Sequence, residues 1–416
     1  MQTCMRYGRW TFVMFLLGNA GCSASPRIEV EAGAVDRVHT PASVELVIPH
    51  ARTDARVCVI ADGVGQPAQL ECLGDGKARL WWIVSDLPAG RSRTYRLAWQ
   101  ESCEDAAPSV FAWKDSSTPD TKSIDLLFGD RPVLRYVHTP FDGTSEETLD
   151  RTQKPFHHVF DPDGSRLLTK GPGGRFSHHR GIFFGHNRIE AEGGPYDTWY
   201  GGAGDHQLHT RVLETWAGPV MGGHVVEIHW NTRHGRTLAV ERRRVVAFAS
   251  PDDEILIEWA TTVEAVDAPV GLVSSDCHHG GVHFRAAQEV AENEQASRYL
   301  RPARWAELPA DKEVRSDEEA GLFFGDLPWN AIRYPLGERS YTVAYISDPA
   351  NPEGAEFSER LYGRFGEYFP WQLTADCPME ARYRFWVVAD RPVTREQVQR
   401  TYDDLADPPR VILNTN

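Results

Sequence analysis

Short runs of alternating hydrophobic and polar residues fill the first hundred positions of the chain. These runs cover residues 44–48, 56–60, 79–84 and 93–99. Because successive side chains of a strand point to opposite faces, the alternation predicts strands that each bury one face. Turn-forming stretches such as Asp62-Gly63 and Pro88-Ala89-Gly90 separate the runs. We therefore predict a small antiparallel β-sandwich over residues 26–100.

Strand patterns return after a polar interval. Residues 101–121 are rich in Asp, Ser and Pro and are predicted to be a linker. Residues 224–230 and 236–249 predict a long hairpin around His234-Gly235, and residues 254–263 predict the next strand. Further strand patterns at 341–346 and 382–388 indicate that residues 122–416 form a large antiparallel β-sandwich or supersandwich.

One helix is predicted near the end of the chain. Thr394 and Gln397 have the spacing of a capping box, and Pro408-Pro409 ends the run. The fold class expected from the pattern is therefore mostly β with a short C-terminal helix.

Composition narrows the classes of function. Hydrophobic residues make up 41% of the 416 residues and charged residues 25%, which are values of a soluble globular protein. The formal net charge is -15. Binding to nucleic acid regardless of sequence requires Lys and Arg to neutralise phosphates, so this charge argues against a nucleic-acid partner.

The first 22 residues have the pattern of a secretory signal. Arg6 and Arg9 precede an apolar run at residues 10–17, which is far shorter than the ~20 residues that span a bilayer. Ala20-Gly21-Cys22 is similar to a bacterial lipoprotein cleavage site, although Asn19 stands where Leu is usual. Two outcomes stay open: a lipidated Cys22 that attaches the protein to a membrane, or plain export. Either places the protein in a bacterial cell envelope, as a periplasmic protein or an outer-membrane lipoprotein.

Cysteine usage fits an oxidising compartment without fixing the pairing. The chain has 7 cysteines but no Cys-x-x-Cys pair, which argues against a cysteine zinc site. Bridges between Cys58 and Cys72, or between Cys277 and Cys377, are both possible.

The densest chemistry lies between Gly173 and His186. His178, His179 and His186 titrate near neutrality, and Arg180 adds a permanent forked donor. Such a cluster indicates a functional site, although a satisfied polar core has the same composition.

Histidines concentrate around this stretch. Of 16 histidines, only His39 and His50 lie outside the interval from His138 to His283. Three doublets, His157-His158, His178-His179 and His278-His279, can each aim one imidazole into a shared cleft. Three such imidazoles would suit a divalent metal, but no short-range ligand motif supports a metal site, so no metal ligand is assigned.

Two further clusters carry charged groups. Asp276, His279 and Arg285 fall in one, and the other contains Glu359, Arg360, Tyr362 and Arg364. If these arginines are buried, each needs a carboxylate from the protein or from a ligand, and an acidic substrate satisfies that need. No phosphate-binding loop, dinucleotide fingerprint or Gly-x-Ser-x-Gly elbow is present, so no organic cofactor is expected.

Several of these motifs in order resemble the PmoA-like family of uncharacterised bacterial exported proteins. The resemblance rests on Lys154-Pro155-Phe156-His157-His158, Thr169-Lys170-Gly171-Pro172, Ser177-His178-His179-Arg180-Gly181, Gly280-Gly281-Val282-His283-Phe284-Arg285 and Tyr362-Gly363-Arg364-Phe365-Gly366. The methane-oxygenase subunit behind that label needs several apolar spans, which this chain lacks after its signal, so we reject the label as a function. The resemblance implies a fold similar to mutarotase-like sandwiches and a carbohydrate role.

The leading hypothesis is an exported carbohydrate-active enzyme with two possible routes. Hydrolysis would use Asp276 and Glu359 as its two carboxylates. Elimination or epimerisation would use His179, His279 or Tyr362 to move the proton alpha to a uronate carboxylate that Arg180, Arg285 or Arg364 neutralises. The remaining candidate substrate-binding residues are His158, His178, His186 and Arg360. Two alternatives are a non-catalytic sugar-binding lipoprotein and a His-ligated metal-dependent hydrolase or oxygenase.

Overall fold

The structure, a computed structural model, describes residues 26–48, 56–99, 110–274, 279–316 and 322–414. The predicted signal with Cys22 lies outside these residues, as does Asp276. The chain divides into two compact units. The first contains the described residues before position 100 together with 218–220 and those from 407 onward, and the second contains the rest.

The small unit is a seven-stranded antiparallel sheet in the order β2-β5-β4-β3-β6-β1-β26. Trp82, Val84 and Leu97 lie in its core. Its strands are β1 (Arg27–Glu31), β2 (Arg37–Val47), β3 (Val57–Ala61), β4 (Val64–Gly74), β5 (Lys77–Leu87), β6 (Ser92–Trp99) and β26 (Arg410–Asn414).

The last strand corrects the predicted domain boundaries. Residues 122–416 were expected to form the large domain, yet β26 pairs with β1 in the small unit along its whole length. Val411 and Leu413 pack against the core of the small unit, and this apolar contact explains why the end of the chain returns to it.

The cysteines exclude one predicted bridge. Cys72 is free and exposed, so the Cys58–Cys72 pairing is wrong. Cys58 and Cys377 are each disulfide-bonded. Cys277 lies outside the described residues.

The large unit is built on two eight-stranded antiparallel sheets. Sheet 1 has the order β22-β23-β18-β11-β10-β9-β8-β7, and sheet 2 has the order β13-β14-β15-β16-β25-β21-β20-β19. The strands of sheet 1 are β7 (Phe111–Asp115), β8 (Ser123–Phe128), β9 (Arg131–Val137), β10 (Phe156–Val159), β11 (Gly181–His186), β18 (Gly280–Arg285), β22 (Glu356–Arg360) and β23 (Arg364–Tyr368).

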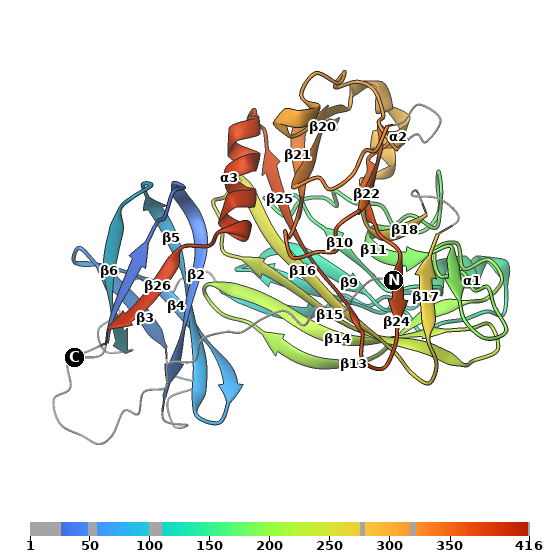
Figure 1. Cartoon of the computed structure of the whole chain (residues 1–416), viewed down its shortest axis with the longest axis horizontal. Helices are drawn as coiled ribbons and strands as arrows, with labels where there is room; N and C mark the ends of the chain where they lie inside the picture. The colour runs from blue at the N-terminus through green and yellow to red at the C-terminus, as the bar shows by residue number, and fades with distance from the viewer. Residues whose placement is uncertain (1–25, 49–55, 100–109, 275–278, 317–321, 415–416) are drawn as a thin grey trace. The chain divides into compact units, whose positions relative to one another are not determined.

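Sheet 2 and the smaller elements complete the unit (Figure 1). Sheet 2 consists of β13 (His206–Trp216), β14 (Met221–Asn231), β15 (Thr237–Phe248), β16 (Glu254–Ala265), β19 (Arg298–Leu300), β20 (Trp329–Leu336), β21 (Arg339–Ser347) and β25 (Met379–Ala389). A three-stranded sheet contains β12 (Arg188–Glu190), β17 (Val270–Val273) and β24 (Trp371–Leu373). The helices are α1 (Glu146–Thr152), α2 (Gln288–Glu292), α3 (Arg395–Ala406) and the single-turn η3 (Glu294–Ala296) and η4 (Ala303–Trp305).

One apolar core lies between the two large sheets. Ile182 and Phe184 of β11 and Phe284 of β18 pack there together with Trp230 and Trp259 of sheet 2. Because side chains alternate along a strand, the residues between them in sequence point to the other face of sheet 1. That outer face therefore receives polar groups without disturbing the core.

The sequence predictions for the fold are largely confirmed. The hairpin of β14 and β15 and the following strand β16 form as expected. At the start of α3, the Thr394 backbone amide donates to Gln397 Oε1 at 2.9 Å, and the Gln397 amide donates to Thr394 Oγ1 at 3.3 Å. The predicted linker is wrong in part, because Phe111 is buried in the core and residues 111–115 pair with β8.

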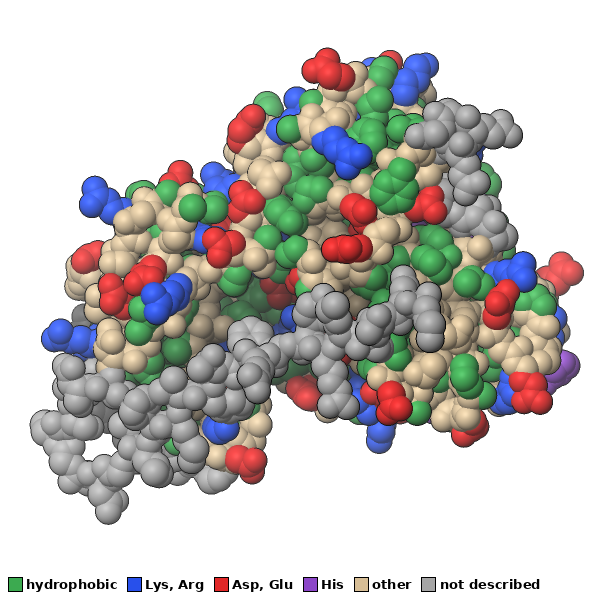
Figure 2. Space-filling model, viewed as in Figure 1, with side chains coloured by type: hydrophobic (Ala, Val, Ile, Leu, Met, Phe, Trp, Pro, Cys, Tyr) green, Lys and Arg blue, Asp and Glu red, His purple; other side chains and the backbone are tan. Residues whose placement is uncertain are grey.

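Acidic and basic side chains are interspersed on the face of the molecule that Figure 2 shows. Among the described residues, no helix is long and apolar enough to cross a membrane.

Candidate functional site

A row of mostly charged residues crosses sheet 1 on its outer face. Strand pairing places Asp125 opposite Arg135, and Arg135 opposite His158. His157 pairs with Ile182, so the next position on each strand sets His158 beside Gly181. Gly181 lies opposite Arg285, Arg285 opposite Arg364, and Arg364 opposite Arg360. Four of the seven residues in this row are therefore arginines.

Gly181 is required at its place in the row. Its φ is +55°, and an added Cβ would lie 2.2 Å from the His157 carbonyl oxygen. Only glycine fits this close backbone approach, which lets the loop before β11 bend over the outer face.

Arg285 is a buried cation that has no carboxylate partner among the described residues. Its side chain is fully buried, and Nη1 donates to the carbonyl oxygens of Ala286 at 2.8 Å and Tyr362 at 2.5 Å. Nε and Nη2 are buried and have no hydrogen-bond partner. Burial lowers the pKa of Arg285 to about 10, which still leaves it charged at neutral pH. Two donors on this guanidinium thus lack a partner among the described residues.

Arg364 lies beside Arg285 in a polar setting. Its Nε donates to the Tyr362 hydroxyl at 3.4 Å, and its Nη2 donates to Ser358 Oγ at 3.1 Å. Nη1 lies 3.2 Å from His283 Nδ1, while His283 Nε2 lies 2.9 Å from the Gly280 carbonyl oxygen. These contacts fit a neutral His283 that carries its proton on Nε2 and accepts from Arg364 on Nδ1.

The loop between β10 and β11 carries His179 onto this face. The His179 ring centroid lies 5.5 Å from Phe176 and 6.3 Å from Tyr362, whose ring is nearly parallel at 11°. His179 is 3% exposed, and neither ring nitrogen has a hydrogen-bond partner in the part of the chain that the structure describes. Burial and the nearby Arg364 hold the pKa of His179 well below its usual value, so the imidazole is neutral.

Four side chains connect the cluster to the surface. His178 packs on His179 with ring centroids 4.1 Å apart, and Tyr200 lies 4.5 Å from His178 and 5.4 Å from His279. His178 and His279 are half-buried, and Phe176 and Tyr200 are 42% and 37% exposed. Burial lowers the pKa of His178 to about 2. Partly exposed aromatic and imidazole rings therefore flank the buried His179, and such rings suit stacking on a sugar.

Positive charge predominates around these rings. Lys154 donates to the Trp199 carbonyl oxygen, and burial lowers its pKa well below the usual value. Arg180 donates to the Ser177 carbonyl oxygen at 3.1 Å and lies 3.5 Å from Asp150, a half-exposed carboxylate. Burial lowers the pKa of Arg180 to about 10. Among the described residues, the excess of buried cations over carboxylates favours an anionic ligand.

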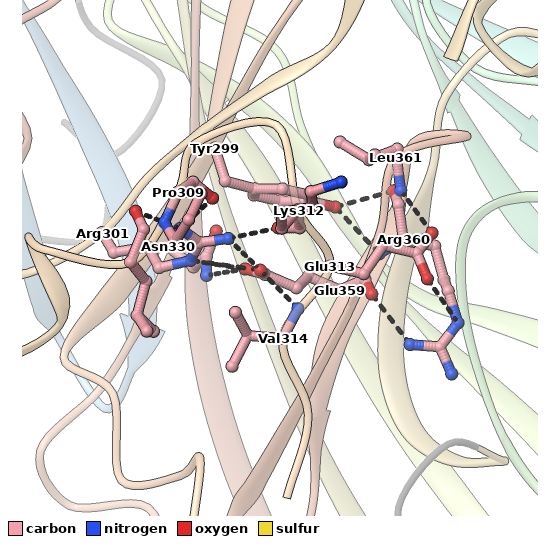
Figure 3. A network of polar contacts seen from close by, with 11 residues as sticks. Tyr299, Arg301, Pro309, Lys312, Glu313, Val314, Asn330, Glu359, Arg360 and Leu361 are labelled. Atoms are coloured by element: carbon pink, nitrogen blue, oxygen red, sulfur yellow. Dashed lines mark hydrogen bonds and ion pairs between the residues drawn. The ribbon is translucent and has the colours of Figure 1, made fainter. Parts of the chain in front are cut away.

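Glu359 lies on the opposite face of sheet 1 and is fully satisfied there (Figure 3). It is fully buried, with Arg301 Nε at 3.1 Å, Asn330 Nδ2 at 2.8 Å and the Val314 amide at 2.9 Å from its oxygens. Burial raises its pKa despite these donors. The expectation that Glu359 is a catalytic carboxylate is therefore corrected. Glu359 and Arg360 are neighbours on β22, so their side chains point to opposite faces, and that of Glu359 points into the interior.

Three other predicted residues stand apart from His179. His186 shares the core-facing side of β11 and packs near Phe184 and Trp230 in the interior, so its assignment to substrate binding is corrected. His158 lies in the row but is engaged by Thr169 Oγ1 at 2.9 Å from Nδ1. Arg360 ends the row, with Nη1 donating to the Glu359 carbonyl oxygen at 2.8 Å.

The histidine doublets do not assemble a metal site among the described residues. His157 and His158 point to opposite faces, and His157 Nε2 lies 2.9 Å from His224 Nε2 between the sheets. No three His, Cys, Asp or Glu side chains in the described ranges are placed to hold a metal ion.

Sequence reasoning did not assign Lys154, Lys170 and His283 to the site. All three belong to the motifs that carry the family resemblance, and their place within these motifs was the available signal. Lys170 Nζ donates to the carbonyl oxygens of Gly171, Gly173 and Phe176, so it fixes the loop that carries His179.

Comparison with known proteins gives a family but no activity. No curated protein matches the chain. One similar solved structure is the GH36 alpha-galactosidase AgaA from Geobacillus stearothermophilus, with 11% identity, 67% of this chain covered and a TM-score of 0.31. The chain spans 40% of the length of that structure, and a likeness this distant has no bearing on activity. A profile described as "Family of unknown function (DUF6807)" matches residues 123–403. Because that match covers more than half of the chain, the protein belongs to this family.

Proposed function

We propose that the protein is an exported carbohydrate-active enzyme that acts on an acidic sugar by moving the proton alpha to its carboxylate. One observation carries the proposal: among the described residues, Arg285 is buried without a counter-charge and has two donors without a partner, beside Arg364 and the unpartnered imidazole of His179. An unpaired buried charge is costly, and its persistence indicates that a ligand supplies the missing anion.

The two arginines suit a sugar carboxylate. A guanidinium binds a carboxylate through a planar fork, and Nε with Nη2 of Arg285 form one edge of that fork. Removal of the adjacent proton shifts negative charge onto the carboxylate oxygens. Fixed cations in a dry site stabilise that charge, which lowers the barrier to proton removal.

His179 and Tyr362 are the residues proposed to move the proton. Neutral His179 takes the proton from the carbon next to the carboxylate, and the C–H electron pair moves into the carboxylate as an enolate. In elimination, this pair re-forms a double bond, the bond from the neighbouring carbon to its oxygen breaks, and Tyr362 donates a proton to the leaving oxygen. In epimerisation, Tyr362 instead delivers a proton to the opposite face of the same carbon.

The described residues offer less support for hydrolysis by two carboxylates. Glu359 is saturated on the far side of sheet 1, and Asp276 lies outside the described residues. Asp197, another carboxylate near the cluster, accepts hydrogen bonds from the backbone amides of Trp199 and Tyr200 at 2.8 Å each. A retaining or inverting pair needs two free carboxyl groups at a defined separation.

A second candidate is a sugar-binding protein without activity. The very low basicity of buried His179 favours it, because an efficient general base has a pKa near the working pH. Under this alternative the arginines and aromatic rings hold the same acidic sugar, and no bond changes.

Export is part of the proposal. The N-terminal pattern supports it, and the disulfides of Cys58 and Cys377 suit an oxidising compartment. Attachment through a lipidated Cys22 and membership of the PmoA-like family stay predictions.

The test is conversion of acidic sugars by purified protein. Uronates and oligouronates are incubated with wild type, His179→Ala and His234→Ala, a control at an exposed turn residue. Ultraviolet absorbance follows unsaturated products, and NMR follows epimers. We expect conversion by wild type and His234→Ala, with at least ~100-fold loss in His179→Ala, the usual size of a general-base contribution. Binding without conversion by wild type would favour the second candidate.

A further inference from the structure

A cleft of about 470 Å³ lies next to the cluster and has no part in the proposed chemistry. One wall is the stretch from Arg166 to Gly174, and the other is formed by Ala287, Gln288 and Glu289 at the start of α2. This volume falls within the ~300–1,000 Å³ of typical ligand sites.

Two residues connect the cleft to the cluster. Lys170 lines the cleft, and its Nζ donates to the Phe176 carbonyl oxygen at 3.3 Å. The backbone amide of Arg175 donates to Gln288 Oε1 at 3.1 Å, while its guanidinium lies 4.8 Å from the Tyr362 ring centroid. The loop from Lys170 to Arg180 therefore faces the cleft at one end and the cluster at the other.

Basic side chains continue from the cluster into the cleft, where burial lowers the pKa of Lys170 to about 7. Arg285 and Arg175 lie on Tyr362, and Lys170 and Arg166 line the cleft beyond them. Glu289 lies 3.5 Å from Arg166, and Glu294 lies 2.6 Å from Arg175. Both carboxylates are partly exposed, at 58% and 40% of the side chain, so each is free to swing into solvent when an anion takes its place.

We infer that this cleft is a subsite for a neighbouring unit of an acidic oligosaccharide, so that the substrate is a chain of uronate units and not a single sugar. The inference rests on the proposed function, because it places the reacting unit at Arg285 and Tyr362. Successive negative charges along such a chain match the three guanidinium groups of Arg285, Arg175 and Arg166. Gly173 in the cleft wall has no atom within 4 Å of where a Cβ would stand, so a sugar ring has room to approach the backbone there.

The test compares a monomer with a tetramer. Isothermal titration with galacturonate and guluronate monomers and their tetramers is carried out on wild type, Glu289→Trp, Glu292→Trp and Arg285→Gln. Glu289 lines the cleft, so a Trp there fills it, whereas Glu292 is exposed on the same helix and does not line it. We expect wild type to bind a tetramer at least ~10-fold more tightly than its monomer. One added ion pair of ~1.4 kcal/mol would produce this difference in affinity. Glu289→Trp should remove that preference, Glu292→Trp should keep it, and Arg285→Gln should weaken both ligands.

The outcomes separate the two claims. Equal affinity of wild type for monomer and tetramer, or an undiminished preference in Glu289→Trp, overturns the subsite while the acidic-sugar function stands. No binding of any uronate by wild type overturns the proposed function and the subsite together.

Discussion

Arg285 of β18 lies directly opposite Arg364 of β23, and both side chains are buried on the outer face of sheet 1. Like charges in a directly opposed cross-strand pair destabilise a sheet. Here the cost is increased by burial, because Arg285 has no carboxylate beside it. A sheet that only had to fold would gain nothing from this pair, and the anionic ligand of the proposed function would account for it.

Replacement of Arg285 by an apolar residue should therefore cost little stability. We expect Arg285→Met to change the free energy of unfolding by no more than about 1 kcal/mol, because the unpaired charge is removed along with its hydrogen bonds. Arg301→Met, which breaks the ion pair to Glu359, should cost ~3–5 kcal/mol. Urea denaturation of both variants gives the comparison, and equal losses would remove the argument for a ligand-binding arginine.

Glu359 should matter for folding and not for chemistry. Glu359→Ala leaves Arg301 and Asn330 without their buried partner, and we expect a loss of ~3–5 kcal/mol in the free energy of unfolding. Glu313→Ala, at a partly exposed carboxylate 3.7 Å from Arg360, should change it by ~1 kcal/mol or less. Any soluble Glu359 variant that folds but has lost all turnover would return this residue to the catalytic candidates.

Buried histidines should make the protein sensitive to acid. Burial lowers the pKa of His186 to about 3 and that of His224 to about 3, whereas the unfolded chain titrates near 6.5. The unfolded state then binds more protons, so the stability contributed by each neutral imidazole is present above pH 6.5 and is lost as the pH falls toward 3. For each of these histidines, the free energy of unfolding should fall by up to ~1.4 kcal/mol per pH unit below 6.5. Thermal melts should show a falling Tm between pH 7 and pH 5, and His186→Phe should reduce the slope.

The stability contributed by Glu367 should depend on pH in the opposite direction. Burial raises its pKa to about 7 from 4.5, although Ser347 Oγ donates to it at 2.8 Å. Its contribution to stability is present below pH 4.5 and is lost as the pH rises through 7. Glu367→Gln keeps the hydrogen-bond geometry without the charge, so its stability relative to wild type should improve from pH 5 to pH 8. A pH-independent difference in the free energy of unfolding would contradict this reading.

The sequence predicted the strands better than the faces to which side chains point. The hairpin of β14 and β15 and the cap of α3 follow from local alternation and capping, which need no knowledge of partners. His186 was misassigned because residues 182–184 are all apolar, so β11 shows no period of two that would separate its faces. Glu359 and Arg360 illustrate the same limit, since adjacent charges on a strand serve opposite faces.

The pairing of strands that lie far apart in the sequence also could not be predicted from local sequence patterns. Residues 410–414 read as one short strand whose partner lies almost four hundred positions earlier, in β1. By contrast, the grouping of Arg285, Arg364 and His179 was anticipated, because buried arginines and histidines bounded by glycines have few reasons to occur in a sheet.

The most direct measurement of the central claim is a titration that changes only the ligand charge. Wild-type protein is titrated with a uronate oligosaccharide and with its methyl ester, and the same pair is measured on Arg285→Gln. We predict that wild type binds the free acid at least ~10-fold more tightly than the ester, and that Arg285→Gln loses this discrimination. Equal affinity of wild type for acid and ester would contradict the assignment of Arg285 to a sugar carboxylate.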